Sequence, residues 1–362
     1  MRKRVLILSG VNWDATFQRH HKVAEFFIDD GYDVDFVSGI KSTSLFTFKR
    51  WYSYLKAKFC TKPRSHSNPY PSSDFFEYKC FNIPHVTFLN DISAKILCRN
   101  MRYDNYDHII VYVPCSFTKS VLSLVSTDHL VYDCVRNFSD WPNISKNVIL
   151  NEKDLLCLAN TILVDSYYLR DKLTREHHNV FQILPSVSDI SLPKYECNPI
   201  RKTITKLAFF GTISSHFDMS ILKVLESKSI ELLFWGVDDL GIVDEYDFIT
   251  AMGYESNETS LLESIMSNSD GIIIPYKGVM NGVIPAKIMQ CLLTGMPVFI
   301  SDFYDSRIMK DNLYIYKNPN ELGHLLSSFS FENHECKSEY NVELAKENLD
   351  SKFNKKLRNS IT

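Results

Sequence analysis

The chain has 362 residues, which at about 150 residues per domain predicts two domains. Apolar residues make up 45% and charged residues 23%, the balance of a folded protein rather than of a disordered one. The net charge of −3 argues against a strongly basic nucleic-acid binder, and 12 glycines and 13 prolines are too few for a collagen-like or linker-like chain.

The nine cysteines occur singly, without a CxxC pair, and Cys98, Cys115, Cys134 and Cys157 lie inside apolar segments. This usage predicts buried free thiols in a reducing compartment rather than a disulfide framework or a zinc site. The start, MRKRVLILSG, has only five apolar residues before Gly10, so it predicts a first strand rather than a signal peptide. No apolar run reaches the length of a membrane-spanning helix.

Apolar runs of strand length alternate with amphipathic segments of helix length from the N-terminus onward. A helix is expected over 17–30, where Val23, Phe26 and Phe27 share one face and Gly31 follows. Because such alternation implies parallel strands joined by crossovers, we expect a doubly wound α/β sheet. The expected strands of the first half are 5–9, 32–38, 108–113, 130–134 and 161–165.

The alternation restarts after a polar, proline-containing stretch over 185–203, so we predict a second Rossmann-like domain. The domain ranges are 1–190 and 204–338, followed by a charged helical segment within 339–362. Ligands of open α/β sheets bind beyond the C-terminal ends of the strands, which predicts a cleft between the domains. The expected strands are 206–210, 230–235, 248–253, 271–275 and 297–301, and the expected helices are 218–227, 256–269 and 285–294.

The most informative stretch is 271–300, GIIIPYKGVMNGVIPAKIMQCLLTGMPVFI. A strand and a loop are followed by Pro285, which opens a helix that places Lys287 and Gln290 on one face. A helix N-terminus with a nearby lysine suits a diphosphate, and Gln290 is placed to hydrogen-bond a ribose hydroxyl. The alternative is an ordinary αβ unit in which Lys287 and Gln290 are solvated.

The motif P-x-K-x-x-Q-x-x-x-x-G-x-P-V over 285–298, after a strand ending in Pro-Tyr, resembles the donor-site motif of GT-B glycosyltransferases. It is most similar to that of the xanthan glucuronosyltransferase and the teichuronic-acid-type transferases. The resemblance implies that Lys287 binds the nucleotide diphosphate, that Gln290 binds the ribose, and that Tyr276 and the loop with Asn281 line the donor pocket. Many retaining members have Glu at Gln290 and at Gly282, so their two-Glu signature is absent.

Weaker matches extend the resemblance over nearly the whole chain. It implies that 1–190 binds the acceptor, that 204–338 binds the nucleotide-sugar, and that the last helix crosses back to the first domain. In the first half, 12–21 resembles the loop and helix start that face the acceptor, and 130–133 matches a strand of that half. The donor side adds the turn at Gly211 and Thr212, Gly236 at the end of the next strand, and a base-binding loop at Tyr254 and Glu255.

An inverting transfer needs a base for the acceptor hydroxyl, whereas in a retaining transfer the donor phosphate can take the proton. In inverting relatives the base is thought to be an Asp three residues beyond the position of Asp133, where this chain has Arg136. Arg136 can instead hold an anionic group. The candidates for the base are Asp14, Asp133, Asp140, His20 and His21, and the candidate catalytic residues are Asp14, Asp133, Arg136 and Lys287.

Each of these candidates also has an ordinary structural interpretation. Asp14 can cap a helix that begins near Thr16. His20 and His21 can be helix-surface residues, and Asp133 can satisfy buried backbone groups. The sequence leaves these alternatives, and the stereochemistry, open.

Residues 39–73 contain seven Lys or Arg and no Asp or Glu. Within them, Phe48, Trp51, Tyr52, Leu55 and Phe59 are spaced for one face of a helix. A basic aromatic helix over 41–64 suits an anionic membrane surface. The alternatives are a helix that packs on the sheet and, less favoured because the rest of the chain lacks a basic groove, a single-stranded nucleic-acid site.

The resemblance therefore implies a glycosyltransferase that moves a sugar from a UDP-sugar to a lipid-linked saccharide in surface polysaccharide biosynthesis, at the cytoplasmic face of the cell membrane. No cofactor and no metal are expected, because Lys287, with the backbone at Gly211 and Thr212, can stabilise the leaving group. Two alternatives remain: a nucleotide-sugar 2-epimerase on the same scaffold, and a catalytically degenerate protein that binds a glycan or scaffolds an assembly.

Overall fold

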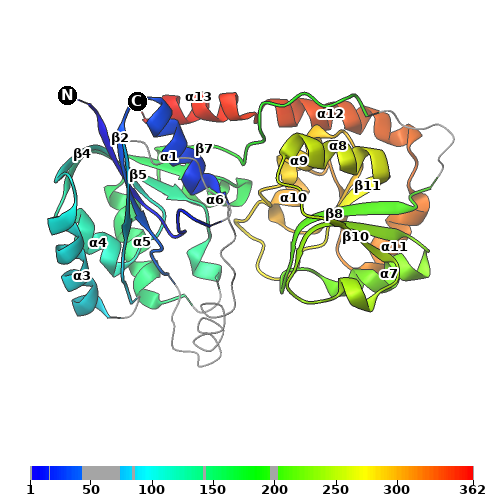
Figure 1. The fold of residues 1–362 in the computed structure, drawn as a ribbon, viewed down its shortest axis with the longest axis horizontal. Coiled ribbons are helices and arrows are strands. Elements are labelled where there is room, and N and C mark those ends of the chain that lie inside the picture. Colours follow the sequence, from blue (N-terminus) through cyan, green and yellow to red (C-terminus); the bar gives the residue numbers. More distant parts are fainter. Residues whose placement is uncertain are drawn as a thin grey trace. The chain divides into compact units, whose positions relative to one another are not determined.

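The computed structural model describes residues 2–15, 17–42, 74–83, 86–141, 144–195 and 203–361. The chain forms two compact units (Figure 1). The first unit comprises Met1–Val164, Leu169–Gln182 and Arg358–Thr362, and the second comprises Asp165–Tyr168 and Ile183–Leu357. Apart from Asp165–Tyr168, the second unit thus begins at Ile183, earlier in the sequence than the expected end of the first domain at residue 190.

The first unit is built on a seven-stranded parallel sheet in the order β3-β2-β1-β4-β5-β6-β7. Ile7 pairs with Phe36 on one side and with Ile110 on the other, and all three are fully buried. Sequence order reverses beside β1, which is where ligands bind in open α/β sheets. The strands are β1 (Arg4–Leu8), β2 (Asp33–Ser38), β3 (Phe75–Lys79), β4 (Asn105–Val111), β5 (Ser126–Cys134), β6 (Thr161–Val164) and β7 (Val180–Gln182).

Helices follow these strands as crossovers (Figure 1). The first helix begins at Arg19 rather than at residue 17, because the Gln18 N–H donates to Nδ1 of His21 and closes the helix start. Asp14 therefore does not cap this helix. The helices are α1 (Arg19–Asp29), α3 (Thr87–Asn100), α4 (Ser116–Leu122), α5 (Lys146–Leu158) and α6 (Tyr167–Leu173), with a short 3-10 turn at Phe138–Asp140.

The second unit is built on a six-stranded parallel sheet in the order β10-β9-β8-β11-β12-β13. Two of its strands are longer than the sequence predicts, since they continue through Gly211 and Gly236 instead of ending there. The strands are β8 (Lys206–Ile213), β9 (Glu231–Asp238), β10 (Ile249–Gly253), β11 (Gly271–Ile274), β12 (Val298–Ser301) and β13 (Tyr314–Tyr316).

The helical segment predicted at the C-terminus is two helices, α12 (Glu335–Lys346) and α13 (Asp350–Ile361). They are separate because Val187 lies beside Leu349: its N–H donates to Asn348 O over 3.1 Å, and its carbonyl accepts from the Asp350 N–H over 2.9 Å. The last residues of α13 belong to the first unit, where Ser360 O accepts from Thr161 Oγ1 over 3.1 Å. The predicted return of the chain is thus confirmed.

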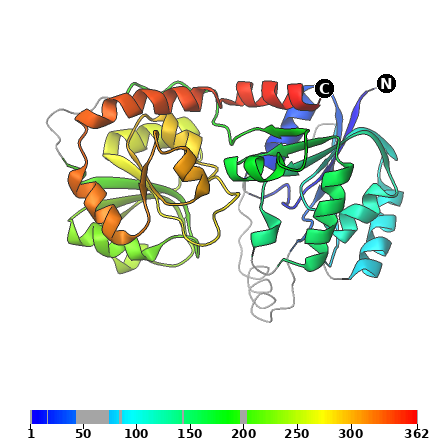
Figure 2. The same ribbon diagram turned by 180° about the vertical axis from the view of Figure 1, so that it is seen from behind.

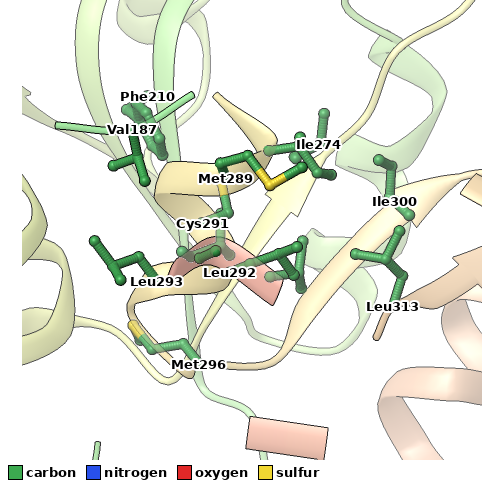
Figure 3. Close-up of a cluster of buried hydrophobic side chains, with 14 of the residues drawn as sticks. Val187, Phe210, Ile274, Met289, Cys291, Leu292, Leu293, Met296, Ile300 and Leu313 are labelled. Atoms are coloured by element: carbon green, nitrogen blue, oxygen red, sulfur yellow. The ribbon is translucent and has the colours of Figure 1, made fainter. Parts of the chain in front are cut away.

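The remaining helices cover both faces of the second sheet (Figures 1 and 2). Alternate strand residues point to opposite faces, so Ala208 and Phe210 pack in one buried cluster and Leu207 and Phe209 in another. Figure 3 shows the first cluster, with Met289 and Cys291 among its members. These helices are α7 (Leu222–Ser227), α8 (Glu258–Asn268), α9 (Ile288–Leu293), α10 (Tyr304–Ile308) and α11 (Pro319–Ser328), with 3-10 turns at Met219–Ile221, Val243–Glu245 and Glu332–His334.

Three observations concern the predictions made from composition: the cysteines, membrane-spanning helices and the basic aromatic segment. The seven cysteines that lie in the described ranges are free thiols. Among the described residues, no helix combines the length and the apolar character needed to cross a bilayer. Most of the basic aromatic segment predicted over 41–64 lies outside the described residues.

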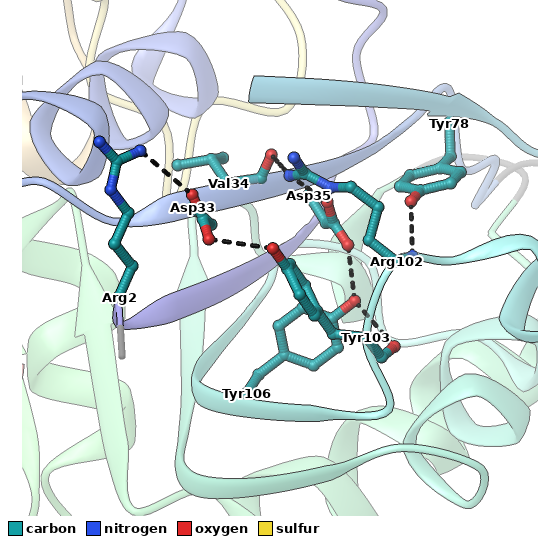
Figure 4. A network of polar contacts seen from close by, with 8 residues as sticks. All are labelled: Arg2, Asp33, Val34, Asp35, Tyr78, Arg102, Tyr103 and Tyr106. Carbon is teal, nitrogen blue, oxygen red and sulfur yellow. Dashed lines mark hydrogen bonds and ion pairs between the residues drawn. The ribbon is translucent and has the colours of Figure 1, made fainter. Parts of the chain in front are cut away.

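A buried carboxylate organises the edge of the first sheet (Figure 4). Asp35, on β2, has no exposed surface; its Oδ1 accepts from Arg102 Nε over 2.7 Å and its Oδ2 accepts from the Tyr106 hydroxyl over 2.7 Å. The Arg102 N–H donates to the Tyr78 hydroxyl over 2.9 Å, which brings β3 into the same network. Burial raises the pKa of Asp35, and its two donors oppose that rise.

We expect Asp35→Asn to destabilise the fold by about 2 kcal/mol, because it leaves the Arg102 guanidinium without its counter-charge. Urea unfolding of the full chain measures this loss. Tyr103→Phe is the milder control, since it removes a single hydrogen bond to Asp33 and should cost about 1 kcal/mol. An unchanged midpoint for Asp35→Asn would contradict the assigned role.

Candidate functional site

Two glycines face each other where β8 and β9 pair. Gly211 and Gly236 are paired in the parallel register, with φ values of 113° and 143°. A Cβ atom on Gly236 would lie 1.9 Å from Gly211 O, so no side chain fits there. Gly211 and Thr212 are exposed, so the C-terminal end of β8 presents open backbone.

The Lys287 side chain reaches this glycine pair. Its Nζ donates to the carbonyl oxygen of Phe210, and a Cβ on Gly211 would lie 3.0 Å from that nitrogen. The ammonium lies 4.1 Å from the ring centroid of Phe209 and 5.3 Å from that of Tyr276, at cation–π distance. Within the described ranges, no carboxylate pairs with it.

Burial lowers the pKa of Lys287 to about 8. The cause is desolvation, because removing an ammonium from water without a counter-charge disfavours the charged form. A bound anion would reverse this effect and favour the ammonium. The geometry is therefore that of a site for an anionic group, which Gly211 leaves room to approach.

The local helix differs from the prediction. Pro285 does not open a helix: the Ile288 N–H donates to Pro285 O over 2.9 Å in a tight turn, and α9 begins at Ile288 with Lys287 as its N-cap. Gln290 follows in the first turn of α9. The helix is too short to supply a strong dipole, so the Lys287 side chain carries most of the positive potential.

Gln290 has a partner that the sequence does not reveal. Its Nε2 donates to Glu258 Oε1 over 2.5 Å. Glu258 is half-buried in the first turn of α8, where the Asn257 side chain caps the helix by accepting from Ser260 N over 2.9 Å. In the described part of the chain no cation pairs with Glu258, so its second oxygen can accept hydrogen bonds.

The other residues predicted on this side lie at the same edge of the sheet. Tyr276 is half-buried, and Phe217 pairs with it in an antiparallel bridge. Burial raises the pKa of the Tyr276 hydroxyl. Tyr254 and Glu255 are exposed just beyond β10, and Asn281 is exposed in the turn before α9.

In the first unit, Asp133 is paired with Arg19. Arg19 Nε donates to the two carboxylate oxygens over 3.1 and 2.9 Å. The Asp133 side chain has no exposed surface and that of Arg19 is 12% exposed. The carboxylate therefore holds the start of α1 against the end of β5 and does not merely satisfy backbone groups.

His20 and His21 are buried rather than on a helix surface. Nδ1 of His20 lies 3.0 Å from Ser9 Oγ, and its ring stacks on Tyr112 at 3.6 Å. Nδ1 of His21 accepts from the Gln18 N–H, so its Nε2 carries the hydrogen and donates to Asn12 O over 3.1 Å. Burial lowers the pKa of both rings, which keeps them neutral.

The remaining first-unit candidates lie at the same edge with different exposure. Asp14 is exposed in the turn after β1, which the Ala15 N–H closes by donating to Asn12 O over 3.1 Å. Asp140 is also exposed. Arg136 is half-buried, with its guanidinium 4.2 Å from the ring centroid of Trp141. No group of three His, Cys, Asp or Glu side chains among the described residues is arranged to hold a metal ion.

Two residues were missed from the sequence. Arg19 directly precedes the two candidate histidines in the sequence, and its partner, Asp133, is 114 positions away. Glu258 opens a helix as many acidic residues do, and its partner is 32 positions away. Neither pairing has a sequence signal, because only the crossovers bring the partners together.

No protein-family model and no curated protein matches the sequence. Solved structures do match the fold. The sucrose-phosphate synthase from Thermosynechococcus elongatus superposes with a TM-score of 0.67 at 12% identity, covering 99% of this chain and 98% of that one. HepE from Anabaena in complex with UDP gives 0.58 at 10% identity, with 99% of each chain covered. The lipopolysaccharide outer core galactosyltransferase WaaB gives 0.57 at 11% identity, with 100% and 99% covered.

At this level of identity the likeness establishes the fold. The chain has the GT-B fold of these glycosyltransferases, with two parallel sheets, as the donor motif led us to expect.

We expect Gly236→Ala to destabilise the second unit by about 3 kcal/mol, because the methyl group meets Gly211 O and the backbone adopts an unfavourable φ. Gly241→Ala is the matched control: its φ of 76° is also positive, but a Cβ there has no atom within 4 Å. Thermal unfolding compares them. Equal losses for the two variants would show that contact with Gly211 is unimportant.

Proposed function

We propose that this protein is a glycosyltransferase that moves a sugar from a UDP-sugar to a saccharide acceptor. The observation that carries the proposal is the Lys287 ammonium, which lies against the Gly211–Gly236 pair and has no carboxylate partner among the residues that the structure describes. HepE, which shares the fold, was solved with UDP. The proposal joins that fold to a site in this chain whose chemistry suits a nucleoside diphosphate.

Departure of the nucleoside diphosphate is the step that needs help, because negative charge develops on the leaving phosphate. Lys287 supplies a positive charge close to the exposed backbone at Gly211 and Thr212. Phe210 O and the aromatic rings hold the ammonium in place, so little reorganisation is needed when the charge develops. A lysine in this role replaces the charge that a metal ion would supply, and we propose transfer without a metal.

Recognition of the ribose would fall to Gln290 and Glu258 together. A carboxylate accepts hydrogen bonds from hydroxyl groups more strongly than an amide does. The bond from Gln290 orients Glu258 and leaves one carboxylate oxygen to accept. Tyr254, Glu255, Tyr276 and Asn281 are proposed to complete the nucleotide-sugar site.

The first unit would bind the acceptor at the C-terminal edge of its sheet. Asp133 neutralises Arg19 and is proposed to position it rather than to take a proton. Asp14 is the exposed carboxylate in the turn after β1, and we propose it as the base for an inverting reaction. Arg136 is proposed to hold an anionic group of the acceptor or donor, braced by Trp141.

We further propose a lipid-linked acceptor and a role in surface polysaccharide assembly at the inner face of the cell membrane. The support is the basic aromatic composition of 41–64, together with a fold shared with WaaB, a lipopolysaccharide galactosyltransferase. A lipid-linked substrate requires an enzyme that works at a membrane surface.

A thermal-shift panel of nucleotides and nucleotide-sugars tests the donor proposal, since a ligand that binds only the folded state raises Tm. We expect UDP or a UDP-sugar to raise Tm in the unmodified chain. Lys287→Ala should abolish most of that Tm shift. It should lower the affinity for UDP at least about tenfold, as loss of a charge-assisted hydrogen bond does. Lys277→Ala, an exposed lysine of the same loop, should behave as the unmodified chain.

The pKa of Lys287 gives this experiment a second readout. Because the free ammonium loses its proton near pH 8 and the diphosphate favours the charged form, UDP affinity should fall as pH rises from 8 to 10. That fall should be absent in Lys287→Ala. No response to any nucleotide would contradict the proposed function, and an unchanged response in Lys287→Ala would remove Lys287 from the site.

The ribose contact is tested by comparing UDP with 2′-deoxy-UDP and 3′-deoxy-UDP in calorimetry. Glu258→Gln should lower the affinity for UDP about tenfold. It should also reduce the difference in affinity between UDP and the deoxy analogue that lacks the contacted hydroxyl. Glu263→Gln, an exposed carboxylate on the same helix, is the control. If Glu258→Gln lowers the affinity for all three nucleotides equally, Glu258 does not contact a ribose hydroxyl.

A further inference from the structure

The α3 helix of the first unit has a second apolar face. One face is packed and contains Asn90, Ala94 and Leu97. The opposite face carries Phe88, Ile92 and Ile96, four residues apart, and Leu89 beside them, with exposed fractions of 70% for Phe88 and 57% for Ile96. A surface helix normally places polar residues there.

A groove of about 550 Å³ continues this surface between α3 and the edge strand β3. Phe81, Leu89, Ile92 and Ile96 contribute its exposed apolar lining. Phe76, also exposed, stacks at 4.6 Å on Tyr78, which lines the groove as well. We call Phe76, Phe81, Phe88, Leu89, Ile92 and Ile96 the α3 patch.

Basic side chains surround the α3 patch. Lys95 and Arg99 lie on the same face of the helix as Phe88 and Ile92, and Lys79 lies at the end of β3; all three are exposed. Across the described ranges, none of these three cations is paired with a carboxylate. Two partly buried carboxylates also lie here: Asp91, which accepts a hydrogen bond from Ser120 Oγ, and Glu77, which lines the groove. The three exposed cations therefore outnumber the carboxylates around the apolar side chains.

We propose that the α3 patch is a contact surface for an anionic lipid bilayer. Phe and Ile side chains partition into the interfacial layer, while Lys and Arg at its rim meet phosphate groups. A second copy of this chain fits less well, because a two-fold contact would bring Lys95 and Arg99 of both copies together. This inference stands independently of the donor site, since it concerns neither Lys287 nor a nucleotide.

Co-sedimentation of the full chain with vesicles tests the proposal. We expect binding to vesicles of phosphatidylethanolamine and phosphatidylglycerol, weak binding to pure phosphatidylcholine, and loss of binding at high salt. Phe88→Ser should lower the partition coefficient about tenfold, and Lys95→Glu about fivefold or more. The matched controls are Leu158→Ser, 66% exposed on α5, and Lys153→Glu on the same helix.

The comparison has outcomes that overturn the proposal. Unchanged binding in Phe88→Ser and Lys95→Glu would place the membrane contact elsewhere, in 41–64 for example. No binding of the unmodified chain to either vesicle, or a monomer–dimer equilibrium in sedimentation that Phe88→Ser abolishes, would assign the α3 patch another occupant. UDP thermal shifts should be the same in all four variants, which separates this test from the donor site.

Discussion

The second unit depends on one constraint: a lysine ammonium is held against main chain and aromatic rings, and no carboxylate in the described part of the chain pairs with it. Removing such a group from water is unfavourable, as the lowered pKa of Lys287 records. The ammonium fits here because Gly211 has no side chain to occupy its place, and Phe209, Phe210 and Tyr276 surround it. An arrangement that is unfavourable when empty becomes favourable when an anion enters, and this is the basis on which a nucleoside diphosphate is proposed as its ligand.

In the first unit, by contrast, buried ionisable side chains are paired with an opposite charge or kept neutral. Asp133 and Arg19 neutralise each other, Asp35 and Arg102 do the same at the other edge of the sheet, and His20 and His21 are kept neutral by burial. The Asp133–Arg19 pair and the hydrogen bonds of His20 and His21 hold the loop after β1 and the start of α1 together. The exposed charges of this unit include the basic side chains around the α3 patch. This surface is therefore the feature of the first unit for which we propose a partner.

Binding of the donor and contact with the membrane would therefore rest on separate units of the chain. The donor residues belong to the second unit, and the α3 patch belongs to the first. Neither uses side chains of the other, so each can be changed without altering the other. This separation matches an enzyme that draws a water-soluble donor and a lipid-linked acceptor from different phases.

The sequence by itself determined the two αβ halves and the parallel strands, because strand–helix alternation is a local pattern. The spacing of Pro285, Lys287 and Gln290 is also local, and from it the donor site is predicted. It misjudged the ends of β8 and β9, since a glycine usually ends a strand and only the neighbouring strand reveals that Gly211 and Gly236 face each other. It missed Arg19 and Glu258, whose partners lie 114 and 32 positions away. It left open whether His20 and His21 are candidates for the base or helix-surface residues, and aromatic neighbours from other strands bury them. Local periodicity fixes which elements form, whereas the burial and pairing of a polar side chain depend on residues that only the tertiary structure brings near, and there the tertiary structure decided.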